Sequence, residues 1–181
     1  KVKRYSKVVE NLKIIRDAEL KFFEATGNYT KDKTLLIKFI DSASLALTET
    51  NTIVETVNRG GGITDEIEIR VTDTIGYEPV LKYFENRDYK NMFQVPGLKG
   101  VEYDLEIGTV EKVQGLIVPT FMSKTPKDAL LKGMSASLVK QELEVMASDQ
   151  IKGEYISVGS LNEVTTAGNW PPSYDKKDNK K

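Results

Sequence analysis

The chain has 181 residues, 39% of them hydrophobic, and its 26 basic and 27 acidic residues leave a net charge of −1. This is enough for one ordinary domain with a hydrophobic core, and the balanced charge gives no general attraction to nucleic acid. Neither cysteine nor histidine occurs, which excludes disulfides, thiolate–zinc sites and catalysis by a histidine base. We therefore expect a protein that is not an enzyme and that binds no cofactor or metal.

The first stretch, from Tyr5 to Gly27, predicts a long amphipathic helix, because its apolar residues recur at steps of three and four. Gly27 predicts its end. Thr30 then predicts the cap of a second, shorter helix. The apolar residues of the two helices predict a core between helix and sheet, and its candidate members are Leu12, Ile15, Phe22 and Phe39.

The period changes from helical to two after Leu45. A strand is predicted over Thr48–Val57, and a second over Glu66–Thr72, with Ile67, Ile69 and Val71 facing inward. The glycines of the intervening segment 58–62 are compatible with a phosphate-binding loop, but such loops open a helix. Because these glycines lie between two strand patterns, we predict a hairpin loop instead.

The second half of the chain predicts further strands and short helices. Pro79 suits the first turn of a short helix, and residues 86–100 suit a long loop. Strands are predicted at 101–107, 116–122 and 153–159, with Pro119 at a sheet edge or bulge because proline cannot donate to a ladder. Helices are predicted near 125–133 and from Leu138 to Met146.

This order of elements predicts an α+β fold, in which the long N-terminal helix packs on an antiparallel β-sheet with additional short helices. Residues 1–170 are expected to form a single α+β domain with an N-terminal helical stem. Residues 171–181 are expected to form a disordered polar tail, because they are rich in lysine and aspartate and have little to bury.

Two clusters are candidate ligand sites. Glu102, Asp104 and Glu106 share one face of a predicted strand, as Glu66 and Glu68 do on another. These carboxylates could bind Ca²⁺ or Mg²⁺ or act as an acid/base pair if the strands were neighbours, and they are otherwise a solvated strand face. Four aromatic residues could stack on a sugar or belong to the core; they are Tyr103, Phe121, Tyr155 and Trp170.

The first residues are basic: Lys1, Lys3, Arg4 and Lys7 precede the main apolar stripe. They are compatible with a contact to lipid headgroups and equally with a solvated helix end. No apolar run is long enough to cross a bilayer. Because a helical pattern is already running at the first residue, a preceding membrane segment is one expectation and an ordinary domain boundary is the other.

The N-terminal part resembles bacterial type IV pilin-like proteins, especially pseudopilins, in which a long helix runs into a Gly-x-Tyr turn, a short helix and an antiparallel sheet. The matching residues are Leu12, Ile15, Ala18, Phe22, Gly27, Tyr29, Leu36 and Phe39. The stretches 153–161 and 168–170 also resemble the end of an uncharacterised bacterial family with one membrane helix and an exported α+β domain. The pilin processing site, the calcium loop and the pilin disulfide loop are absent from this sequence.

The resemblance implies a structural or assembly protein of the bacterial cell envelope, periplasmic or at the cell surface, tethered through an upstream membrane helix. Its expected partners are proteins or further copies of itself, and not nucleic acid. The alternative is a carbohydrate- or peptide-binding envelope module that uses exposed aromatics and the face of Glu102, Asp104 and Glu106. A hydrolase with two converging carboxylates is a third hypothesis.

Overall fold

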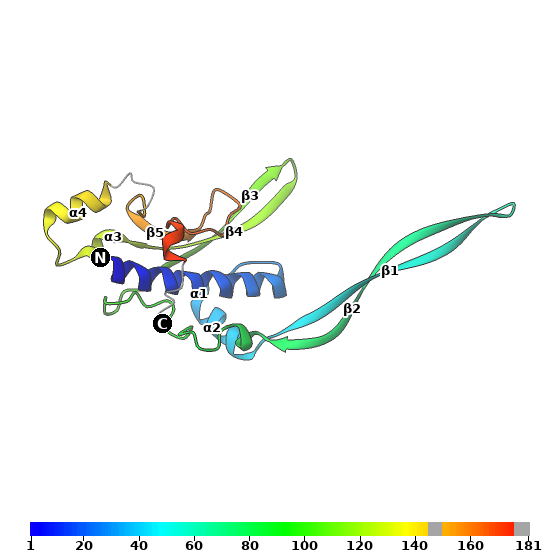
Figure 1. Ribbon diagram of the computed structural model, residues 1–181, viewed down its shortest axis with the longest axis horizontal. Helices are drawn as coiled ribbons and strands as arrows, with labels where there is room; N and C mark the ends of the chain where they lie inside the picture. Colours follow the sequence, from blue (N-terminus) through cyan, green and yellow to red (C-terminus); the bar gives the residue numbers. More distant parts are fainter. Residues whose placement is uncertain (145–149, 176–181) are drawn as a thin grey trace.

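The structure is a computed structural model and describes residues 1–144 and 150–175. Its fold is α+β, with an N-terminal helix, two separate antiparallel sheets and several short helices. Helix α1 (Val2–Thr26) crosses the body, with the three-stranded sheet on one side of it and α2 (Lys33–Ser42) on the other (Figure 1). The two-stranded sheet projects away from the body as a long arm.

Helix α1 forms because apolar side chains cover most of its circumference, which lets it pack against elements on two sides. It ends at Gly27, whose φ of 77° is left-handed and whose amide donates to the carbonyl of Phe23 at 2.7 Å. Helix α2 begins later than predicted. Its cap is Asp32, which accepts from the amide of Leu35 at 3.0 Å, while the Thr30 hydroxyl accepts from the amide of Asp32.

The larger sheet has the strand order β3-β4-β5, formed by β3 (Asp104–Val113), β4 (Leu116–Pro126) and β5 (Tyr155–Gly159). Both pairings are antiparallel. Although β4 is the middle strand, β5 pairs only with its Met122–Pro126 part. Pro119 therefore lies where β4 pairs only with β3. On its other edge there is no strand to which a backbone N–H could donate, so the missing N–H of proline loses no inter-strand hydrogen bond there.

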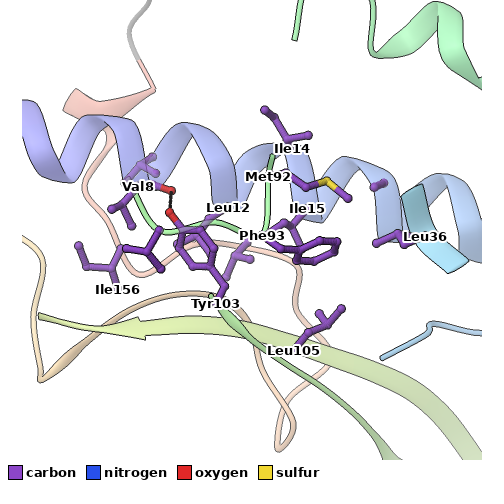
Figure 2. Packing of buried hydrophobic residues seen from close by; sticks show 14 of the residues in the cluster. Val8, Leu12, Ile14, Ile15, Leu36, Met92, Phe93, Tyr103, Leu105 and Ile156 are labelled. Atoms are coloured by element: carbon purple, nitrogen blue, oxygen red, sulfur yellow. Dashed lines mark hydrogen bonds between the residues drawn. The ribbon is translucent and has the colours of Figure 1, made fainter. Parts of the chain in front are cut away.

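The core lies around α1. Figure 2 shows Leu12, Ile15 and Val8 of the helix packed among Tyr103, Leu105 and Ile156 from the sheet side, and Met92 and Phe93 from the segment before β3. The hydroxyl of Tyr103 points to the carbonyl of Val8 at 3.5 Å. Burial raises the pKa of Tyr103, so this phenol is a neutral hydrogen-bond donor inside the core.

The four residues proposed for the core have different environments. Leu12 and Ile15 are completely buried. Phe22 and Phe39 are partly buried and meet each other edge to face, with ring centroids 5.2 Å apart. These two rings join α1 to α2 rather than a helix to a sheet, because the chain reverses directly after α1 and brings the helices side by side.

Short elements complete the body: η1 (Val80–Tyr83), α3 (Lys127–Leu131), α4 (Ala136–Leu143) and η2 (Pro172–Tyr174). The helix predicted from Leu138 to Met146 corresponds to α4, which ends at Leu143. The last predicted members, Val145 and Met146, lie outside the described residues. Residues 171–175 of the predicted tail lie among the described residues, and η2 is part of them. Asp175 accepts from the Trp170 indole at 3.1 Å and pairs with Lys13 at 2.6 Å, which fixes this segment on α1.

Candidate functional site: the β1–β2 arm

The arm is formed by β1 (Ser44–Gly60) and β2 (Ile63–Pro79), which pair with each other in antiparallel register and with no other strand among the described residues. The sequence predicted both strands and the hairpin loop between them. It also predicted that Ile67, Ile69 and Val71 face inward, and this is wrong. No core lies against the arm: Ile67 and Ile69 are each 37% exposed, and Val71 is partly exposed.

One face of the arm is apolar. Cross-strand partners lie on the same face of a ribbon, and Ile53 lies opposite Ile69, Glu55 opposite Ile67, and Asn51 opposite Val71. Val57 continues the stripe toward the tip. Ile53 is 47% exposed. A two-stranded ribbon is marginally stable in water, and an uncovered apolar face of this length is typical of a surface that contacts another molecule.

The opposite face is polar and rich in threonine. The cross-strand pair Thr50 and Thr72 has its hydroxyl oxygens 3.0 Å apart, and Thr52 lies opposite Arg70. β-branched threonine favours the extended backbone while its hydroxyl stays hydrated. The ribbon is therefore amphipathic, although Asn51 and Glu55 interrupt its apolar face and Val54 lies on its polar face.

The tip is a glycine turn. Gly60, Gly61 and Gly62 all have positive φ, between 65° and 87°, a conformation that costs other residues about 1–2 kcal/mol. The Asn58 side chain accepts from the amide of Gly60 at 2.9 Å, and Arg59 pairs with Asp65 at 2.9 Å. The segment opens no helix, so the structure has a hairpin turn here and the phosphate-loop hypothesis has no support.

The base of the arm is fixed to the body. Leu45 is buried, and Glu78 accepts from the Tyr83 hydroxyl at 2.5 Å and from Lys82. The hydrogen bond from Lys82, and then that from Tyr83, lower the pKa of Glu78. The ammonium of Lys21 on α1 lies 3.9 Å from the centre of the Tyr83 ring. The register shifts between Leu47 and Thr48, where Ile75 of β2 is the extra, bulged residue, and beyond this bulge no arm residue is buried.

The predicted acidic face is partly engaged by neighbouring basic and amide side chains. Glu102 pairs with Lys33 at 2.9 Å and accepts from Gln94 at 3.0 Å, and Lys33 lowers its pKa. Asp104 and Glu106 are exposed on β3, and Lys124 lies opposite Asp104 in the sheet register. Glu66 and Glu68 are in the other sheet, so the two acidic strands are not neighbours. Within residues 1–144 and 150–175, no three carboxylates gather as metal ligands.

Of the two alternatives for the four aromatic residues, a sugar platform or the core, the core is confirmed for three of them. Tyr103, Phe121 and Trp170 are core residues, and only Tyr155 is exposed, with the Lys124 ammonium 4.9 Å from its ring centre. Strand alternation places Tyr103 and Phe121 on the face toward the body interior, where large rings bury the most surface.

A different aromatic pair lines a small cavity at the open edge of β4. Tyr29 and Phe121 have ring centroids 4.8 Å apart, and both line a cavity of about 330 Å³ together with Thr120. Thr120 is 3% exposed, and its hydroxyl has no hydrogen-bond partner among the described residues. The sequence pattern marked Tyr29 only as part of a turn, because a cavity lined by segments far apart in the chain leaves no periodic signal.

Glu19 is a buried carboxyl that the sequence analysis did not single out. It is completely buried on α1. One carboxyl oxygen accepts from the amide of Thr30 at 3.0 Å, and the other has no partner in the part of the chain that the structure describes. Burial raises the pKa of Glu19 to about 8. The sequence did contain one signal of this burial, because Glu19 follows Ile15 by four residues and so lies in the apolar stripe of the helix.

A second buried polar group joins the start of α1 to α3 and α4. The Lys127 ammonium is fully buried and donates to the carbonyls of Ile151 and Glu142. Burial lowers the pKa of Lys127. The Glu142 carboxylate pairs with Lys1 and accepts from the Tyr5 hydroxyl at 3.4 Å. Every member of this group is engaged in a contact that holds elements together.

Comparisons with protein-family models, with curated proteins and with solved structures found no match. No helix in the described part of the chain is long and apolar enough to cross a membrane. The arm is therefore the candidate site on the strength of its own geometry: a long, amphipathic, uncovered ribbon held at one end by a packed body.

Proposed function

We propose that this chain is a structural or assembly protein rather than an enzyme, and that its arm is the element that contacts a protein partner. The observation that carries the proposal is the exposure of both faces of β1 and β2 beyond Leu47. Covering the apolar stripe would contribute about 25 cal/mol per Å² of apolar surface removed from water. The two open edges also offer backbone N–H and C=O groups to a further strand.

The proposal places the protein in the bacterial cell envelope, outside the cytoplasm and tethered by an upstream membrane helix, as in the pilin-like proteins that the first forty residues resemble. The order of long helix, glycine turn, short helix and antiparallel strands supports this part of the proposal. Its test is to read the gene upstream of Lys1 and to fractionate the producing cell. A cytosolic protein without an upstream apolar segment would contradict it.

The arm proposal is tested by photo-cross-linking in the producing bacterium. A benzoylphenylalanine placed at Ile53, on the apolar face, should give a defined adduct with a protein partner. The matched control is the same probe at Lys31, which is exposed on the body. Adducts from the body position alone, or from neither position, would contradict a contact through the arm.

One observation favours a second function, the binding of a small carbohydrate or peptide group. The cavity beside Tyr29 is lined by this ring together with Thr120 and Phe121 of β4. A ligand with an apolar face would displace water from the Tyr29 ring. Glycan-array or calorimetric binding that is lost in Tyr29→Ala would support this function, and unchanged binding in that variant would contradict it.

A further inference from the structure

The arm and the rest of the chain carry opposite charges. Residues 44–79 hold seven acidic and two basic residues, a net charge of −5, while the remaining sequence holds 24 basic and 20 acidic residues, a net charge of +4. The near-neutral total therefore conceals a separation of charge between two parts of one molecule. Such a separation favours association between the arm of one molecule and the body of another.

The apolar face of the arm carries much of this negative charge. The cross-strand pair Glu49 and Asp73 lies at the base of the face, and Glu55 lies beside Ile53 and Ile67. Among the described residues none of these three carboxylates has an ion-pair partner. Two arms packed face to face would bring like charges together in a partly dehydrated interface, which costs free energy. A basic surface with some apolar area is the complementary partner.

The body offers such a surface at its far end. Lys3, Arg4 and Lys7 are exposed on the first two turns of α1, and none of them forms an ion pair with a described residue. Val2 is 60% exposed beside them, and Leu138 is 54% exposed on α4, whose Glu142 pairs with Lys1. Figure 1 shows this end of α1 and α4 on the side of the body away from the arm.

We propose that the arm of one copy lies with its apolar face against the basic N-terminal end of α1 in a second copy. This inference rests on the proposed function and names its partner. The arm, at 17 residues per strand and about 3.3 Å per residue, is roughly 55 Å long, enough to reach across a neighbour. Because donor and acceptor surfaces differ, the contact is head to tail and repeats from copy to copy, as an open chain or a closed ring.

The first test is sedimentation velocity of the full chain at increasing concentration. A variant without the distal arm, in which residues 47–76 are replaced by Asn-Gly, keeps the proposed acceptor surface. We expect the full chain to self-associate, the armless variant to be monomeric, and a labelled armless variant to co-sediment with the full chain. A monomeric full chain would overturn the head-to-tail contact. So would a full chain that self-associates but does not co-sediment with the labelled armless variant.

The second test uses point variants that keep the body intact. Ile53→Asp, on the apolar face, should weaken self-association at least tenfold, whereas Thr52→Asp, on the opposite face of the same strand, should change it less than threefold. The double variant Lys3→Glu/Lys7→Glu should also weaken it at least tenfold, and mixing with Glu49→Lys/Asp73→Lys should restore association. Equal effects of the two Asp substitutions, or no restoration on mixing, would overturn the proposal.

The sedimentation and cross-linking experiments together distinguish failure of the second-copy contact from failure of the arm as a contact element. If the full chain is monomeric while the arm probe at Ile53 cross-links to a different envelope protein, the second-copy inference fails and the arm remains a contact element. If neither self-association nor an arm adduct is found, both fail.

Discussion

The amide of Val80 donates to the carbonyl of Ala43 at 2.9 Å, so the residues that precede and follow the arm lie side by side. Thirty-six residues leave the body and return to the same point. The two ends of the arm therefore meet at the surface of the body. The arm is an insertion whose distal part contributes nothing to the core.

Replacing residues 47–76 by Asn-Gly should leave the body folded, because Ala46 and Tyr77 are already cross-strand partners and a two-residue type I′ turn can join them. Leu45 and Glu78, which anchor the base, are retained. We expect the free energy of unfolding to change by about 1 kcal/mol or less. Circular dichroism and urea denaturation measure this, and loss of cooperative unfolding would show that the arm supports the body.

Leu12→Ala should destabilise the protein by about 2–5 kcal/mol, because this side chain is fully buried between the sheet and the segment before β3, where a cavity cannot easily collapse. Glu10→Ala is the matched control on the same helix. Glu10 is exposed, so its loss should change the free energy of unfolding by less than about 0.5 kcal/mol. Similar effects of the two substitutions would contradict the described packing of α1.

Stability should fall as the pH rises from about 4.5 to 8. Burial raises the pKa of Glu19 from 4.5 to about 8 in the folded protein, so across this range the folded state keeps a proton that the unfolded state loses. Below 4.5 both states are protonated and the group contributes no dependence. We expect Glu19→Gln to raise the free energy of unfolding at pH 7.5 by about 1–3 kcal/mol.

The measurement is chemical denaturation of the wild type and Glu19→Gln between pH 4 and 9. Glutamine retains an oxygen that can accept from the amide of Thr30, and it carries no charge, so the variant should lose this part of the pH dependence. The same stability difference at pH 4 and pH 8 would show that Glu19 does not titrate as described.

Gly159→Ala should be much more damaging than Gly97→Ala. Both glycines have positive φ, of 74° and 80°, which any other residue adopts at a cost of about 1–2 kcal/mol. A Cβ at Gly159 would also lie 2.2 Å from the carbonyl oxygen of Phe121 in the adjacent strand, whereas one at Gly97 meets no atom within 4 Å. We expect the Gly159 variant to cost at least about 3 kcal/mol in thermal or urea denaturation.

The sequence by itself determined the local elements. The helical stripe from Tyr5 to Phe22, the two alternating segments around the glycine turn, and the exposed acidic face of Glu102 and Glu106 follow from the short-range geometry of helices and strands, which repeats every 3.6 or two residues. Boundaries that depend on a cap shifted by a few residues; the cap of α2, for example, is Asp32 instead of Thr30.

Only the tertiary structure decided what each apolar face meets. Alternation marks Ile67 and Ile69 as one face of a ribbon in the same way that it marks Leu105, yet the first two lie on an uncovered arm and the last lies against α1. The alternation in a strand shows which residues share a face, but it does not show which element packs against that face. The packing depends on contacts between residues far apart in the chain. The burial of Tyr103 and the cavity beside Tyr29 were decided in the same way.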